Sequence, residues 1–249
     1  MPFFQRHDGT QIFYIISGQG APVLLLHGFM GTGASEFLDI RPWLEKKYTV
    51  IAPDLRGYGR SMPKPRLYGR DFYRQDAEDM ADLLEHLNLP PAAVIGYSDG
   101  GEVALWLPIL VPRLVRSVLT WGATGHFHPS MRPAVLSMLN MRWRTPLIDQ
   151  LHGAEHIADM THHWVNAMLQ IIDSGGDITY SRAKEIACPV LLMLGDKDEL
   201  NPVAMGRSMA AALPRGQFSL YRRTGHAVHS ERPRRFRREA SRFLSRTRG

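Results

Sequence analysis

The chain has 249 residues, of which 44% are hydrophobic and 22% are charged, a composition typical of one folded globular unit of ordinary size. Its formal net charge is +6, but residues 230–249 alone carry eight arginines against two glutamates, so the rest of the chain is neutral overall. A chain-wide basic surface is therefore excluded and no nucleic-acid partner is expected, while the single cysteine, Cys188, excludes an internal disulfide.

The chain begins with MPFFQRHDGT, which lacks the apolar stretch of a signal peptide, so we expect a cytoplasmic protein. Seven short runs that follow are typical of strands. Most are almost continuously apolar, as in central strands covered on both faces, and all are too short to insert across a membrane. The predicted strands are residues 11–17, 22–28, 48–54, 92–98, 115–122, 189–195 and 216–222.

Helical patterns lie between these strands. Residues 71–88 carry apolar side chains at i, i+3 and i+4 spacing, and Pro90-Pro91 is expected to end that helix. A second helix is expected over residues 102–111. The alternation of strands and helices predicts an α/β protein with a doubly wound, mostly parallel sheet.

Residues 126–182 break this alternation. They have no clear strand pattern, and prolines and glycines divide them into several short helical stretches. A helical insertion between two strands is the simplest interpretation. We therefore predict a core made of residues 1–125 and 183–249, with residues 126–182 inserted into it.

A serine with the pattern of a nucleophile stands at the end of the fourth predicted strand. Residues 96–100, Gly-Tyr-Ser-Asp-Gly, fit G-x-S-x-G, in which a serine occupies a tight strand-to-helix turn and glycines avoid collisions on both sides. The apolar strand before Ser98 and the helical run after it agree with that context. The structural alternative is that Ser98 only caps the following helix.

An acid and a base follow in the chain order Ser, Asp, His. Asp198 comes after the predicted strand 189–195, and His226 comes after the strand 216–222. Strand carboxyl ends gather at one edge of a parallel sheet, so these groups are expected to meet there. His226 would carry protons and Asp198 would orient it, with His229 and Asp196 as the rival base and acid.

Two backbone N–H groups are also needed to stabilise the oxyanion of acyl transfer. One is expected from Asp99, the residue after the serine. The other is expected from Phe29, in the loop that follows the strand 22–28.

These motifs together resemble the α/β-hydrolase-fold serine hydrolases along nearly the whole chain. Within that superfamily the sequence most resembles the biphenyl-hydrolase-like group, which includes valacyclovir hydrolase. The resemblance implies a helical cap at residues 126–182 and hydrolysis of small esters, including α-amino acid esters. It rests on HGFMG, GTGASEF, PDLRGYGRS, GYSDGG, VLTWGATG, HHWVNAM, GDKDEL and TGHAVHSERP.

The acid after the serine narrows the expected substrate. In the biphenyl-hydrolase-like group an acid at this position is associated with holding the substrate's ammonium, and the carboxylate of Asp99 could reach an ammonium one carbon from the scissile carbonyl. The structural alternative is that Asp99 simply suits the first turn of a helix. We expect Asp99, Met30 and Trp164 to contact the substrate.

No cofactor or metal is expected. Gly-rich nucleotide motifs are absent, and His152-Gly-Ala-Glu-His156, which fits a zinc-protease pattern, contains a glycine that weakens a helix and has no assigned third ligand. The predicted function is a serine carboxylesterase acting on small esters. The alternatives are a hydrolase of carbon–carbon bonds in aromatic meta-cleavage products, an acyltransferase and a non-catalytic ligand receptor; the oligomeric state stays open.

Overall fold

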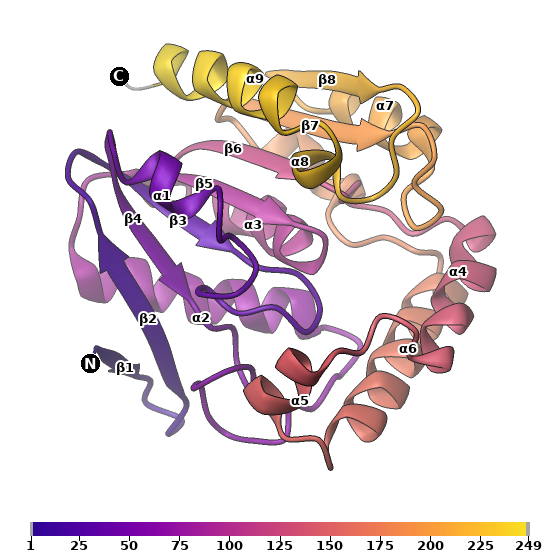
Figure 1. Cartoon of the computed structure of the whole chain (residues 1–249). Helices are drawn as coiled ribbons and strands as arrows, with labels where there is room; N and C mark the ends of the chain where they lie inside the picture. Colours follow the sequence, from indigo (N-terminus) through magenta and orange to yellow (C-terminus); the bar gives the residue numbers. More distant parts are fainter. Residues whose placement is uncertain (1, 248–249) are drawn as a thin grey trace.

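A computed structural model describes residues 2–247 of the chain as an eight-stranded sheet with helices on both faces (Figure 1). The strand order is β1-β2-β4-β3-β5-β6-β7-β8; β1 and β2 run antiparallel to their neighbours, and the remaining pairs are parallel. The predicted doubly wound, mostly parallel sheet is confirmed. The strands are β1 Phe3–Gln5, β2 Gln11–Ser17, β3 Ala21–Leu26, β4 Tyr48–Pro53, β5 Ala92–Tyr97, β6 Val115–Trp121, β7 Val190–Gly195 and β8 Gly216–Tyr221.

All seven predicted strands are present, and most end one or two residues earlier than expected. The sequence pattern missed β1, because three residues are too few to show alternation. The α-helices are α1 Arg41–Leu44, α2 Phe72–Leu87, α3 Asp99–Leu110, α4 Arg132–Ser137, α5 Pro146–His152, α6 Ile157–Asp173, α7 Val203–Ala212, α8 Val228–Glu231 and α9 Pro233–Arg246. Short 3₁₀ turns occupy Pro112–Leu114, Pro129–Met131, Met138–Asn140 and Tyr180–Glu185.

Two hydrophobic clusters cover the two faces of the sheet, because successive strand side chains point to opposite sides. Leu24 and Val94 belong to the cluster that packs against α2 and α3. Leu25 and Ile95, one residue further along the same strands, belong to the cluster that packs against α1 and α9. The central strands are thus buried on both faces, which accounts for their continuous apolar sequences.

Two helix boundaries differ from the sequence prediction. Helix α2 ends before Asn88, which adopts a left-handed conformation (φ 48°, ψ 41°), so Pro90-Pro91 follows the end rather than causing it. Helix α3 begins at Asp99, directly after the serine, instead of at residue 102, and it continues through Pro108.

The segment between β6 and β7 holds α4, α5 and α6 and lies beyond the carboxyl ends of the central strands (Figure 1). An antiparallel bridge between His126 and Asp177 joins its two ends. These helices therefore stand on the side of the sheet where Ser98 follows β5. The outermost residues of the predicted core, Met1, Arg248 and Gly249, lie outside the described residues.

Helix α9 is amphipathic, with Phe236, Ala240, Phe243 and Leu244 buried against the sheet as its sequence suggests. Neither α9 nor any other helix within residues 2–247 combines the length and apolar character needed to span a bilayer.

Candidate active site

Ser98 occupies a strained turn between β5 and α3. Its backbone has φ 54° and ψ −122°, a region that non-glycine residues rarely adopt. A Cβ on Gly96 would lie 2.1 Å from the carbonyl oxygen of Gly100, and a Cβ on Gly100 would lie 2.3 Å from that of Leu26. Both glycines are therefore required for the turn to close. The Ser98 hydroxyl makes no capping bond to α3, which disfavours a role limited to capping.

The structure brings Ser98, His226 and Asp198 into one hydrogen-bonded chain. His226 Nε2 lies 2.9 Å from Ser98 Oγ, and His226 Nδ1 lies 2.8 Å from Asp198 Oδ2. The other carboxylate oxygen of Asp198 accepts from the backbone N–H groups of Leu200 and Asn201, at 3.0 and 3.1 Å. These bonds hold the carboxylate in place, with Nδ1 donating to it and Nε2 left to accept from the serine hydroxyl.

The rival base and acid are engaged elsewhere. His229 Nδ1 accepts a hydrogen bond from Trp121 Nε1 at 2.8 Å, and burial lowers the pKa of His229 to about 4. Asp196 Oδ1 accepts from the backbone N–H of Thr224 at 3.3 Å. The structure thus brings His226, rather than His229, to the serine.

The two amides expected to bind an oxyanion belong to Phe29 and Asp99. Neither amide donates a hydrogen bond to any group in the described part of the chain. The loop that carries Phe29 lies against the serine, since a Cβ on Gly28 would approach the Cβ of Ser98 to 3.0 Å. The Phe29 ring packs against the Trp164 ring with centroids 4.8 Å apart, so the loop also contacts α6.

Asp99 is buried and bonded by two uncharged donors. The Tyr73 hydroxyl donates to one carboxylate oxygen at 2.7 Å, and Trp164 Nε1 donates to the other at 2.9 Å. Burial raises the pKa of Asp99, and these two hydrogen bonds oppose that rise by stabilising the ionised form. The buried cation Arg66 is held by Asp76, at 2.6 Å, and makes no bond to Asp99.

A small cavity of about 20 Å³ opens beside the serine, between the carboxyl ends of the central strands and α6. Four of the residues predicted as catalytic or substrate-binding line it: Ser98, Asp99, Trp164 and His226. Sequence reasoning did not identify several other lining residues. They are Tyr73, Gly122, Phe127, Leu200 and Asn201; Glu102, one turn after Ser98, and Met131 and Met168 of the inserted segment line the cavity as well.

Met30 lies apart from that lining, and its role as a substrate contact stays a prediction. Its side chain is 4% exposed within the core, its φ is 58°, and its carbonyl oxygen accepts from His152 Nε2 at 2.9 Å. The other ring nitrogen of His152 accepts from the Gly59 N–H at 3.2 Å. Both ring nitrogens of this first histidine of the zinc-protease pattern are therefore hydrogen-bonded within the protein. Across residues 2–247, no group of three His, Cys, Asp or Glu side chains is placed to hold a metal ion.

Glu102 is a second buried carboxyl group at the cavity. Its Oε1 accepts from the backbone N–H groups of Thr124 and Gly125, at 2.8 and 3.1 Å. Burial raises the pKa of Glu102 to about 7. The two hydrogen bonds hold the loop after β6, where residues 126–182 begin. Below pH 7 the Glu102 carboxyl group is mainly neutral.

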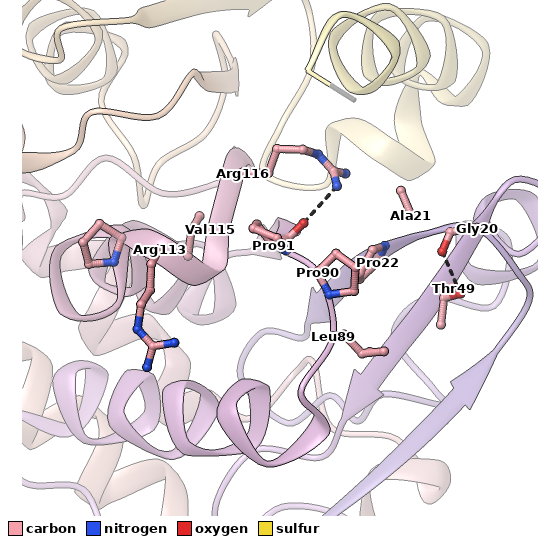
Figure 2. A pocket seen from close by; sticks show the side chains of 11 residues that line it. Gly20, Ala21, Pro22, Thr49, Leu89, Pro90, Pro91, Arg113, Val115 and Arg116 are labelled. Carbon is pink, nitrogen blue, oxygen red and sulfur yellow. Dashed lines mark hydrogen bonds between the residues drawn. The ribbon is translucent and has the colours of Figure 1, made fainter. Parts of the chain in front are cut away.

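A larger cavity of about 740 Å³ lies at the opposite end of the parallel strands (Figure 2). It is lined by residues at the amino ends of the parallel strands, among them Ala21, Thr49 and Val115, with Arg113 and Arg116 beside Pro90 and Pro91. Since none of Ser98, His226 and Asp198 lines it, the small cavity is the candidate active site despite its size.

Comparisons with known proteins agree with this fold. A family model described as alpha/beta hydrolase fold matches residues 21–152. The human protein named Serine hydrolase BPHL is 33% identical over 205 residues, covering 78% of this chain and 69% of that protein. The predicted resemblance is therefore confirmed.

Solved structures also superpose on the chain. An esterase from Exiguobacterium antarcticum matches with a TM-score of 0.78 and 22% identity, covering 98% of each chain. A meta-cleavage product hydrolase from Pseudomonas fluorescens IP01 matches with a TM-score of 0.75 and 22% identity, covering 96% of this chain and 95% of that one. At these identities the two structures support the shared fold alone.

Proposed function

The chain belongs to the α/β-hydrolase fold family and is a hydrolase, and on this basis we propose that it cleaves small carboxylic esters with a preference for α-amino acid esters. The nucleophile in this proposal is Ser98. His226 Nε2 takes the hydroxyl proton as Oγ forms a bond to the ester carbonyl carbon, and the carbonyl oxygen becomes an oxyanion. The amides of Phe29 and Asp99 donate to that oxyanion.

Collapse of the tetrahedral intermediate expels the alcohol, which takes the proton from His226. Water then repeats the sequence on the acyl-enzyme and releases the carboxylic acid, so Ser98 is restored. Asp198 keeps the His226 ring oriented and stabilises its charged form in both halves.

The observation that carries the substrate preference is the environment of Asp99. Its carboxylate is bonded by Tyr73 and Trp164, which are neutral donors, while Arg66 is already committed to Asp76. A buried ionised group without a cation is costly, and a substrate ammonium would supply that cation. A charge-assisted contact of about 1.5–3 kcal/mol corresponds to roughly a 10- to 150-fold preference.

Residues 126–182 act in this proposal as a cap over the serine. Met131 and Met168 line the cavity from the cap side, and methionine side chains adapt to differently shaped apolar groups. The small volume of this cavity, about 20 Å³, favours a small acyl group over a long chain.

The test is a panel of esters of one alcohol with an aminoacyl, a short acyl or a long acyl group. We expect the highest kcat/KM on the aminoacyl ester and the lowest on the long acyl ester. Burst release of the alcohol would reveal the acyl-enzyme. Ser98→Ala is the control, and full activity in that variant would refute the proposal.

Carbon–carbon bond hydrolysis is the second candidate, since a meta-cleavage product hydrolase shares this fold. Such substrates are anionic, and the carboxylate of Asp99 would repel them. Faster turnover of a meta-cleavage product than of any ester would favour carbon–carbon bond hydrolysis over ester hydrolysis. Addition of a competing alcohol to the ester panel tests acyl transfer, and the absence of any turnover would favour a ligand receptor.

A further inference from the structure

Asn201 contacts the proposed acid of the triad through both its backbone and its side chain. It stands three residues after Asp198, before α7, and its side chain is buried, with 3% of the residue exposed. Its backbone N–H donates to Asp198 Oδ1 at 3.1 Å, and its side-chain Nδ2 donates to Oδ2 at 3.3 Å. Oδ2 is also the oxygen that meets His226 Nδ1, at 2.8 Å.

The orientation of the Asn201 amide follows from these neighbours. Nδ2 lies 3.4 Å from His226 Nδ1, and that ring nitrogen carries the hydrogen directed at Asp198. An amide oxygen facing Asp198 Oδ2 would meet a second acceptor, so the nitrogen has to face the carboxylate. The amide oxygen, Oδ1, is then turned away from the carboxylate of Asp198.

Asn201 stands at the cavity beside Ser98, and its amide oxygen has no partner in the described part of the chain. Asn201 is one of the cavity's lining residues. Its Oδ1 accepts no hydrogen bond from residues 2–247, and it is not among the side-chain atoms that are sealed from solvent without a partner. This acceptor is therefore accessible to a bound molecule.

We propose that Asn201 links the substrate to the triad: Nδ2 positions Asp198, and Oδ1 accepts a hydrogen bond from the ammonium of an aminoacyl substrate. The second half rests on the proposed preference for α-amino acid esters. An ammonium has three N–H donors, and a cavity that strips water from it has to satisfy each of them. Asp99 already accepts from Tyr73 and Trp164, so a further acceptor on the same cavity completes the site.

The two roles predict different kinetic effects. Asn201→Leu keeps a similar side-chain volume and removes both the donor and the acceptor. On a plain acyl ester, loss of the positioning bond is expected to lower kcat about 2- to 13-fold with little change in KM. On the matched aminoacyl ester, loss of the acceptor is expected to raise KM by a similar factor in addition.

The experiment compares wild type, Asn201→Leu and Asn201→Ala on the alanyl and propanoyl esters of one alcohol, with melting temperatures measured for each protein. Asn166→Leu, on the exposed side of α6, is the matched control and should behave as wild type. Should the leucine variant fail to fold, the alanine variant gives the same comparison.

A fall in kcat on both esters with a KM increase only on the alanyl ester supports the proposal. Unchanged constants in folded Asn201 variants would overturn it, and equal KM increases on both esters would overturn the ammonium contact. If wild type hydrolysed neither ester, the proposed function itself would be refuted, whereas an active wild type with insensitive Asn201 variants would refute only this inference.

Discussion

Replacement of Asp99 by asparagine is the most direct test of the proposed substrate preference. The substitution removes one negative charge and changes little else around it. The amide oxygen can still accept from Trp164 Nε1, while the amide nitrogen can donate to the Tyr73 hydroxyl, which rotates to become an acceptor. Asp99→Asn should therefore fold with its two neighbours still paired.

The expected effect depends on the charge of the substrate. A charge-assisted hydrogen bond contributes about 1.5–3 kcal/mol, so kcat/KM on an alanyl ester should fall roughly 10- to 150-fold. The propanoyl ester of the same alcohol differs only by the amine, and its kcat/KM should be unchanged or higher. Both constants are measured at a pH where the amine is protonated, with the melting temperature as a control for folding.

Equal losses on the two esters would refute this reasoning. They would mean that the Asp99 carboxylate serves the geometry of the turn or of the oxyanion amide, and not the substrate's ammonium. A loss confined to the propanoyl ester would contradict the sign of the electrostatic argument.

Three further substitutions test other parts of the site. Ser98→Gly and Ser98→Ala should both be inactive, but the glycine variant should be more stable, by about 1–3 kcal/mol in thermal unfolding, because glycine relieves the strain at φ 54°. Glu102→Gln should remove a pH-dependent contribution to stability: burial raises the pKa of Glu102 to about 7 from 4.5, so its contribution is full at low pH and is lost as pH rises through 7. The melting temperature of wild type relative to this variant should therefore decrease between pH 5 and pH 8, and a constant difference would exclude that role. Tyr73→Phe removes the 2.7 Å bond to Asp99, so the preference for the alanyl over the propanoyl ester should fall about 2- to 13-fold, and an unchanged ratio would count against the bond.

The three residues of the proposed triad were predictable from sequence, because each follows a strand and the turn around Ser98 has a local glycine pattern. Gly96 and Gly100 mark the turn around Ser98, since no side chain fits beside the adjacent carbonyl oxygens. Asp198 and His226 follow strand ends, and parallel strands bring their carboxyl ends to one edge of the sheet. Chain order and strand patterns were therefore enough to propose these three side chains together.

The surroundings of Asp99 were not predictable in the same way. Tyr73 and Trp164 stand 26 and 65 residues away from it, on α2 and α6, and their contacts depend on how those helices rotate and pack. The pattern of α2 indicates that Tyr73 is near the core, but not that its hydroxyl meets a carboxylate. The sequence signal for Asn201 was weaker. Asn201 is close in sequence to Asp198, but an asparagine near an aspartate is also typical of an ordinary turn.

The position of Asp99 also bears on how the reaction tolerates a negative charge beside its oxyanion. In the proposed mechanism the backbone N–H of Asp99 stabilises the oxyanion, while its carboxylate raises the energy of that same developing charge. Tyr73 and Trp164 stabilise the carboxylate without neutralising it, and a plain ester brings no cation of its own to offset this repulsion. An aminoacyl ester brings its own cation between the two negative charges, and its transition state gains more than its ground state because the oxyanion forms only there. The preference should accordingly be larger in kcat than binding of the ammonium alone would give, and removing the charge of Asp99 should reduce kcat on aminoacyl esters as well as raise KM.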